Sequence, residues 1–125
     1  FSVISALLQD AEAKLKDMTF LRDEDQFIVL VSRFVRENNI ENVSQAGTIN
    51  RVRTGLCFDG VKSVRTRDII REKRNILLRF LSVSYVQGEV ALIFRGGGAI
   101  KLKGDNMVCW FRDLDAKPDV GESGV

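Results

Sequence analysis

The sequence predicts an α+β fold, in which an N-terminal helix packs on a curled, mainly antiparallel sheet or partial barrel of seven to eight strands. Apolar residues follow a helical spacing only at the start of the chain, and later they alternate in short runs rich in Val, Ile and Phe. Turn residues, mostly Gly beside Asp, Asn or Gln, separate these runs at short intervals, which is typical of a meander. With 125 residues, 45% of them hydrophobic, the chain is long enough to bury the core of one domain.

The first elements are a helix and a hairpin. The helix is predicted over residues 1–13, because apolar residues recur there at three- and four-residue spacing: Val3, Ile4, Leu7, Leu8 and Ala11. Strands are predicted over residues 18–21 and 27–35, with the charged triplet 23–25 as the turn between them. Residues 37–50 lack sustained periodicity, so we expect a long mobile loop.

The remaining strands are predicted from alternation and from four turn signals. Asp59-Gly60 and Gln87-Gly88 are typical of tight hairpins, and the glycines of 96–98 and the triplet 104–106 give two further turns. The strands between these turns cover residues 51–58, 61–66, 76–86, 90–95, 99–103 and 107–114. Residues 68–75 form a polar, basic helical turn or loop. We therefore expect one domain over residues 1–114 and a flexible tail over 115–125.

The residue types argue against catalysis. The chain has no histidine, which is the commonest general base and the commonest metal ligand. Its two cysteines, Cys57 and Cys109, lie in apolar alternating runs, so we expect reduced, buried thiols, with a single disulfide as the other alternative. The triple glycine lacks the residues of a phosphate loop and fits a hairpin turn. We predict no metal and no cofactor; an enzyme that acts without histidine is the least favoured alternative.

Charge is concentrated in the middle of the chain. Residues 50–80 carry nine Lys and Arg against three Asp and Glu, whereas the whole chain has a net charge of only +2. A basic stretch can neutralise phosphates, so a phosphate or nucleic-acid binding module is the first alternative function. In a hairpin turning at Asp59-Gly60, arginines of both strands would share one face. The candidate binding residues are Arg51, Arg53, Arg65, Arg67, Arg71 and Arg74.

The leading prediction is a small cytosolic binding or interaction protein without catalytic activity. The edge strands of a meander are often covered by a partner or by a second copy, so we expect a protein partner or a homodimer, with nucleic acid less favoured. No run approaches the roughly 20 apolar residues of a membrane span, and no basic segment followed by an apolar core opens the chain. We therefore expect a cytoplasmic location without a membrane partner.

Four segments resemble one known family. They are residues 5–11 (SALLQDA), 26–34 (QFIVLVSRF), 58–61 (FDGV) with Val64-Arg65, and 94–102 (FRGGGAIKL) with the later Arg112-Asp113-Leu114. In order and spacing they resemble a small bacterial, alphaproteobacterial family that is catalogued only as a domain of unknown function. The resemblance extends from about residue 3 to residue 114. It implies a cytosolic single domain, a native start upstream of Phe1, and no assigned activity or catalytic residue.

Overall fold

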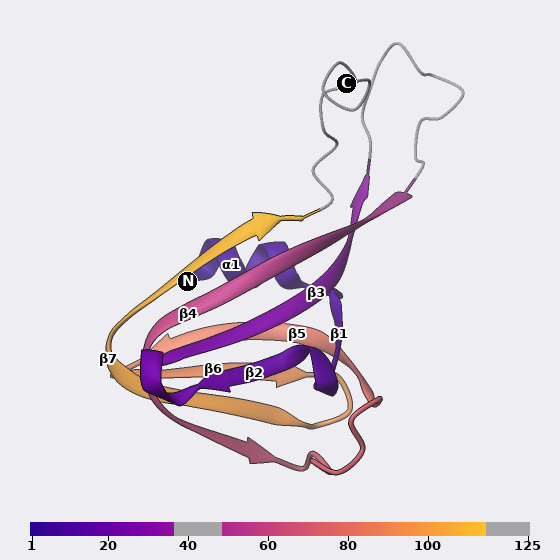
Figure 1. Cartoon of the computed structure of the whole chain (residues 1–125). Coiled ribbons are helices and arrows are strands. Elements are labelled where there is room, and N and C mark those ends of the chain that lie inside the picture. Colours follow the sequence, from indigo (N-terminus) through magenta and orange to yellow (C-terminus); the bar gives the residue numbers. More distant parts are fainter. Residues whose placement is uncertain (37–48, 115–125) are drawn as a thin grey trace, which may run out of the picture.

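One helix and seven strands make up the computed structural model, which describes residues 1–36 and 49–114 (Figure 1). In chain order these elements are α1 (Ser2–Leu8), β1 (Glu12–Lys14), β2 (Met18–Leu21), β3 (Gln26–Arg36), β4 (Ile49–Arg67), β5 (Leu77–Val86), β6 (Glu89–Phe94) and β7 (Ala99–Asp113). Two short 3₁₀ turns, η1 (Leu15–Asp17) and η2 (Arg22–Glu24), lie before and after β2.

The strands form a closed barrel. Neighbours are antiparallel in the order β1-β5-β6-β7-β4-β3-β2, and β1 also pairs with β3, so that six strands close a ring and β2 is attached to β3. Closure depends on Glu12, which stands opposite Ser32 of β3 and opposite Arg79 of β5. The predicted α+β class and antiparallel sheet are confirmed, but the barrel is closed and not partial. Closure also removes most of the edges on which the predicted strand pairing with a partner was based.

The predicted helix is too long, because it ends at Leu8 and β1 follows. Asp10 has a left-handed φ of 65°, and its N–H donates to the carbonyl of Phe80 at 2.9 Å, which turns the chain onto β5. Beyond this turn, Ala11 and Ala13 both join the hydrophobic core, whereas Glu12 between them is buried outside that core, which fits the two-residue period of a strand. Alanine fits both periods, so tertiary contacts decide the conformation.

Helix α1 packs on β5. Its buried residues Ile4 and Leu8 join the core, where the rings of Phe80 and Phe94 meet edge to face with centroids 4.8 Å apart. Ser5 Oγ accepts a hydrogen bond from the backbone N–H of Val83 at 2.9 Å. The helix therefore satisfies a strand amide that no neighbouring strand reaches.

Two predicted hairpins are wrong, because the chain bends there without reversing. Strand β4 runs through Gly60 and β7 runs through Gly104, and the β4–β7 register shifts on both sides of Val61. Gly60 has a φ of 85°, and a Cβ on Gly104 would collide with the carbonyl oxygen of Gly60. The two glycines thus allow the strands to cross closely at a barrel corner, as β-bulges do in closed sheets.

The turns predicted at Gln87-Gly88 and at the triple glycine are confirmed: Gln87 and Gly88 have φ values of 49° and 81°, and Gly96 and Gly97 have positive φ values as well. The strand predicted over 18–21 and the turn at 23–25 are confirmed too. The predicted mobile loop lies outside the described residues apart from its last two, which begin β4, and the predicted tail lies outside them entirely.

A partly buried polar cluster joins β3, β4 and the end of β7. Thr54 is fully buried; its hydroxyl donates to Asp113 Oδ1 at 2.7 Å and accepts from Arg33 Nε at 3.0 Å. Arg33 Nη2 also lies 3.0 Å from both carboxylate oxygens of Asp113. The Thr54 hydrogen bond and then the Arg33 guanidinium hold the pKa of Asp113 below its usual value. The cluster fastens the last strand to the barrel.

Candidate functional site

A cleft opens in the barrel wall where two strands share one edge of β3. Strand β2 pairs with β3 only as far as Val29, β1 pairs with it at Ser32, and η1 leaves the sheet between them. No residue of β1 or β2 stands opposite Leu30 or Val31, so this stretch borders the cleft. The cleft has a volume of about 410 Å³ and is lined by Glu12, Ala13, Lys14, Lys16, Asp17, Leu30, Val31, Ser32, Arg51, Arg53 and Leu77.

Ser32 provides the most informative atom of this β1–β3 cleft. Its Oγ is buried and has no hydrogen-bond partner among the described residues. An unpaired buried hydroxyl costs about 1–3 kcal/mol, so most native structures satisfy such groups. Ser32 lies on the outer face of β3 between Glu12 and Arg53, its partners on the two neighbouring strands. Ser32 is also one of the residues that line the cleft, so the unpaired hydroxyl lies in its wall.

The cleft is positively charged. Lys14, Lys16, Arg51 and Arg53 line it, together with the two acids Glu12 and Asp17. Neither lysine forms an ion pair with an acid in the described parts of the chain. The lining residues have a net charge of +2, from four cations against two acids, and Arg79, which also pairs with Glu12, is a further cation beside them.

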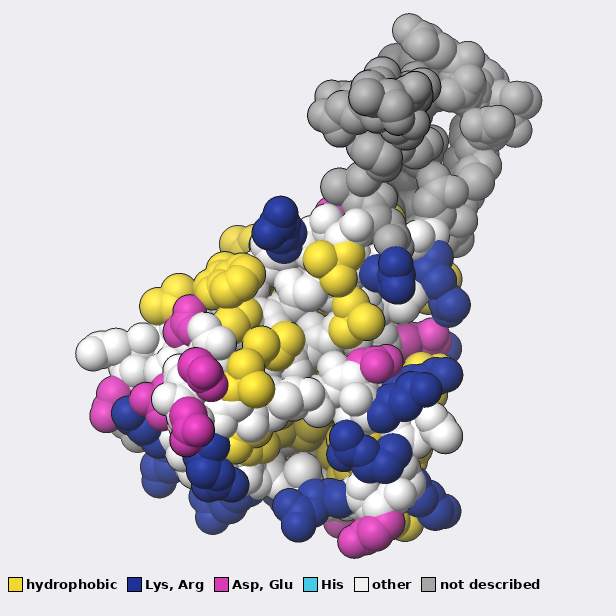
Figure 2. All heavy atoms as spheres, in the orientation of Figure 1, with side chains coloured by type: hydrophobic (Ala, Val, Ile, Leu, Met, Phe, Trp, Pro, Cys, Tyr) yellow, Lys and Arg dark blue, Asp and Glu magenta, His cyan; other side chains and the backbone are white. Residues whose placement is uncertain are grey.

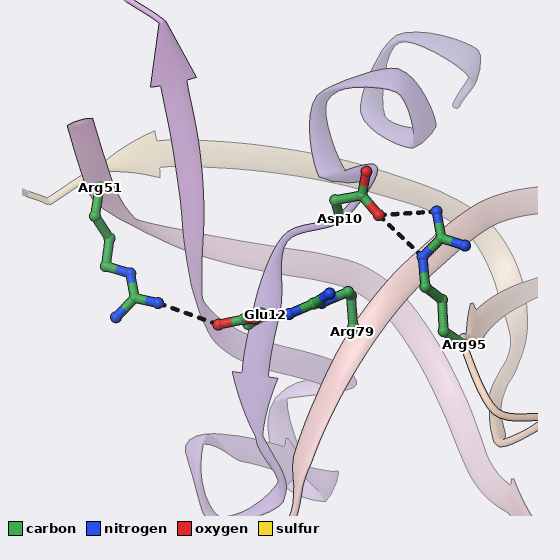
Figure 3. Close-up of polar contacts among 5 residues, drawn as sticks. All are labelled: Asp10, Glu12, Arg51, Arg79 and Arg95. Carbon is green, nitrogen blue, oxygen red and sulfur yellow. Dashed lines mark hydrogen bonds and ion pairs between the residues drawn. The ribbon is translucent and has the colours of Figure 1, made fainter. Parts of the chain in front are cut away.

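Glu12 is held between two arginines, which Figure 3 shows approaching it from opposite sides. Arg51 Nη2 of β4 lies 3.2 Å from one carboxylate oxygen, and Arg79 Nη2 of β5 lies 2.5 Å from the other. The Glu12 side chain is only 9% exposed, and Asp10 binds Arg95 at 2.8 Å beside it (Figure 3). These pairs hold the closing strand β1 against its neighbours.

The six predicted binding arginines lie in three places. Arg51 and Arg53 line the cleft. Arg71 and Arg74 are exposed on the loop before β5, whose Arg74 carbonyl accepts a hydrogen bond from Lys16 N–H at 2.8 Å, so this loop borders the cleft. The expected cross-hairpin patch is wrong in geometry, because β4 continues through Gly60 and carries the remaining two, Arg65 and Arg67, past the barrel corner.

Those last two arginines belong to a second basic surface. Arg65 stands directly opposite Lys101 of β7, and Lys103 stands opposite Ser63 on the same pair of strands. None of Arg65, Arg67, Lys101 and Lys103 forms an ion pair with an acidic side chain within residues 1–36 and 49–114. Like charges directly opposite each other destabilise a sheet. We call these four residues the β4–β7 basic strip.

Sequence reasoning missed the hydroxyl and both lysines of the cleft. Ser32 carried one signal, because it and Arg33 are the two polar residues that interrupt the apolar run 27–35. Lys14 and Lys16 carry none, because the sequence predicts a helix over residues 1–13 and no element over 14–17. Their position depends on β1 and η1, which only the folded structure reveals.

The cysteines do not provide a nucleophile. Both are free; Cys57 is buried on the outer face of β4, whereas Cys109 stands opposite Phe58 and shares the core face. Burial raises the pKa of Cys57 and raises that of Cys109 to about 12, so both thiols are protonated at neutral pH. Within the described ranges, no three His, Cys, Asp or Glu side chains are grouped to hold a metal ion, and no helix is long and apolar enough to cross a membrane.

Fold and cleft together define a small α+β protein, a closed antiparallel barrel with one covering helix and a basic cleft in its wall. The chain belongs to the family described as a protein of unknown function (DUF2948), whose family model matches residues 1–123. No curated protein and no solved structure matches the chain. The family match agrees with the resemblance found in the sequence.

Proposed function

We propose that this protein is a small binding protein without a catalytic centre, and that its β1–β3 cleft holds the phosphate group of a ligand. One observation carries the proposal: the buried Ser32 hydroxyl has no partner among the described residues and lies in a cleft lined by four cations. The missing histidine and the protonated thiols support a binding role over a catalytic one.

The groups around the cleft match the needs of a phosphate. A phosphate offers only acceptor oxygens and negative charge, and the cleft is lined by a hydroxyl, by the ammonium groups of two lysines and by two arginine side chains. Arg51 is oriented by Glu12 and stacks over the Phe34 ring, with its guanidinium carbon 5.2 Å from the ring centroid. A pre-oriented guanidinium loses less side-chain entropy when it binds an anion.

Calorimetric titration with inorganic phosphate, with backbone NMR shifts to locate the site, tests the proposal. Replacing both cleft lysines (Lys14→Ala with Lys16→Ala) removes two charges, and we expect the affinity to fall at least tenfold, which is about 1.4 kcal/mol. The matched control removes two lysines of the strip, Lys101→Ala with Lys103→Ala, and should leave phosphate affinity unchanged. Equal losses in both double variants, or no shifts around Ser32, would refute the assignment.

The β4–β7 basic strip supports a second candidate function, binding of nucleic acid through its phosphates. The observation that favours it is Arg65 directly opposite Lys101, with neither side chain paired to an acid of the described residues. A sheet gains stability when an anion neutralises such a pair. Contacts from four Lys and Arg side chains to the phosphates would be electrostatic and independent of sequence.

Binding of labelled single-stranded and duplex DNA at several salt concentrations tests this second function. Charge reversal of the opposed pair, Arg65→Glu with Lys101→Glu, should abolish binding, and the wild-type affinity should fall steeply as salt rises. The control reversal of Lys14 and Lys16 should have a much smaller effect. Undetectable binding by the wild type at low salt would exclude nucleic acid and leave the cleft proposal intact.

A further inference from the structure

An apolar groove continues the cleft along the outer face of β3, β4 and β7. It has a volume of about 310 Å³ and is lined by Ile28, Val29, Leu30, Gly55, Leu56, Cys57, Trp110, Arg112 and Leu114. Figure 2 shows hydrophobic side chains in the middle of this face and Lys and Arg side chains along its side toward β1. Leu30 lines both the groove and the cleft, so the two hollows adjoin.

The register of the strands places apolar residues at one end of the groove and charged residues at the other. Ile28 stands opposite Cys57, which stands opposite Trp110, and two residues further along β3 Leu30 stands opposite Gly55, which stands opposite Arg112. The next row contains the Ser32 and Arg53 pair. At about 3.4 Å per residue, the path from Ile28 to Ser32 along β3 is about 14 Å long.

Trp110 is fixed in place although it is 48% exposed. Its indole N–H donates to Asp59 Oδ2 at 2.9 Å, and Gln26 Nε2 donates to the other carboxylate oxygen at 2.7 Å. These hydrogen bonds hold the pKa of Asp59 below its usual value, so the acceptor stays ionised. An exposed aromatic ring that is held rigid loses little entropy when a ligand covers it.

The middle of the groove is open because Gly55 has no side chain. A Cβ at this position would lie 3.9 Å from the Leu114 side chain, an ordinary contact, so the fold itself does not require glycine there. At the rim, the Arg112 guanidinium has no ion pair with any acid that the structure describes. The groove therefore combines apolar walls with positive charge at its edge and in the adjoining cleft.

We propose that cleft and groove form one site for an amphiphile, with a phosphate head at Ser32 and an apolar chain along Leu30 and Gly55 to Trp110. This inference rests on the proposed phosphate function of the cleft. Two features favour an anionic amphiphile over other ligands. The apolar groove can hold an apolar chain, and the cations and the unpaired hydroxyl at one end of it select an anionic head. The whole ligand, from the head at Ser32 to the end of the chain in the Ile28 row, would span about 14 Å.

Trp110 is the only tryptophan, so its fluorescence reports directly on the groove. The probes are inorganic phosphate and butyl, hexyl, octyl and decyl phosphate, each below its micelle concentration, with decyltrimethylammonium as the cationic amphiphile. A fully buried methylene contributes about 0.8 kcal/mol, so affinity should rise about two- to fourfold per added methylene in this open groove. The alkyl phosphates should shift the Trp110 emission, and decyltrimethylammonium should bind at least tenfold more weakly than decyl phosphate.

The variant Gly55→Val fills the groove and should abolish the gain with chain length while phosphate affinity is unchanged. Its matched control is Ala91→Val on β6, outside both hollows. Phosphate binding without any gain from the chain would overturn the amphiphile inference and leave the proposed function standing. If neither phosphate nor the alkyl phosphates bind, both the amphiphile inference and the proposed phosphate function are wrong. Equal affinity for decyl phosphate and decyltrimethylammonium would show that the groove binds the apolar chain and that no site selects the phosphate head. That result would also overturn both the inference and the proposed function.

Discussion

Replacing Ser32 with alanine should make the protein more stable and a weaker binder. The wild-type hydroxyl is buried without a partner among the described residues, which costs about 1–3 kcal/mol. Removing one oxygen leaves a small void, which costs a few tenths of a kcal/mol at about 24 cal/mol per Å³. The variant should therefore unfold with a free energy about 1 kcal/mol higher, and its Tm should rise by about 3–6 °C.

Bound phosphate should cancel the higher free energy of unfolding of Ser32→Ala relative to the wild type. If the hydroxyl contributes about tenfold to affinity, phosphate at one hundred times the wild-type Kd stabilises the wild type by about 2.7 kcal/mol and the variant by about 1.4 kcal/mol. The difference of about 1.3 kcal/mol is as large as the gain from the substitution, so the two proteins should become nearly equally stable.

Urea unfolding followed by Trp110 fluorescence, with and without phosphate, measures both effects. With a slope of about 2 kcal/mol per M, the midpoint of Ser32→Ala should rise by about 0.5 M in the absence of phosphate. The control Ser84→Ala removes an exposed hydroxyl from β5 and should stay within about 0.5 kcal/mol of the wild type. A loss of 1 kcal/mol or more in Ser32→Ala without phosphate would show that the hydroxyl is already satisfied, and the reasoning would fail.

Three further predictions concern the barrel. Glu12→Gln keeps one acceptor oxygen but turns the other into an NH2 donor that faces a guanidinium, so one of the two arginine hydrogen bonds is lost and the free energy of unfolding should fall by about 2 kcal/mol; an unchanged urea midpoint would contradict a role in closure. Gly104→Ala forces a Cβ onto the Gly60 carbonyl and should cost about 3 kcal/mol, visible as a lower Tm. Because the Thr54 hydrogen bond and the arginine beside it lower the pKa of Asp113, its contribution is present above the unfolded-state pKa of about 4 and is lost as pH falls through the folded-state value. The stability difference between wild type and Asp113→Asn should accordingly be constant above about pH 5 and shrink below about pH 4.

Local signals predicted the parts of the fold that depend on neighbours in sequence. The Gln87-Gly88 turn is an example, because a tight turn between paired strands needs only residues that tolerate positive φ. Asp59-Gly60 carries the same chemical signal, yet the chain continues there. The conformation of Gly60 suits a turn and a bulge equally, and the decision depends on Gly104, which lies far along the chain and packs against it.

The candidate site was predictable only in part for the same reason. Arg51 and Arg53 stood out as charged residues on an alternating strand, and both line the cleft. The isolation of Ser32 from hydrogen-bond partners is a property of its surroundings and not of its own residue type. The sequence places its strand neighbour Glu12 in a helix, so it does not predict the strand that shapes the cleft.

Barrel closure by β1 also sets the order of events during synthesis. Glu12 must meet Arg79, which lies 67 residues later in the chain, before the ring can close. At about 5–20 residues per second, the ribosome adds those residues in about 3–13 s, and β1 has no partner on β5 in that interval. The N-terminal segment therefore cannot complete its strand pairing until β5 has been synthesised. The cleft that β1 borders exists only after this late contact has formed.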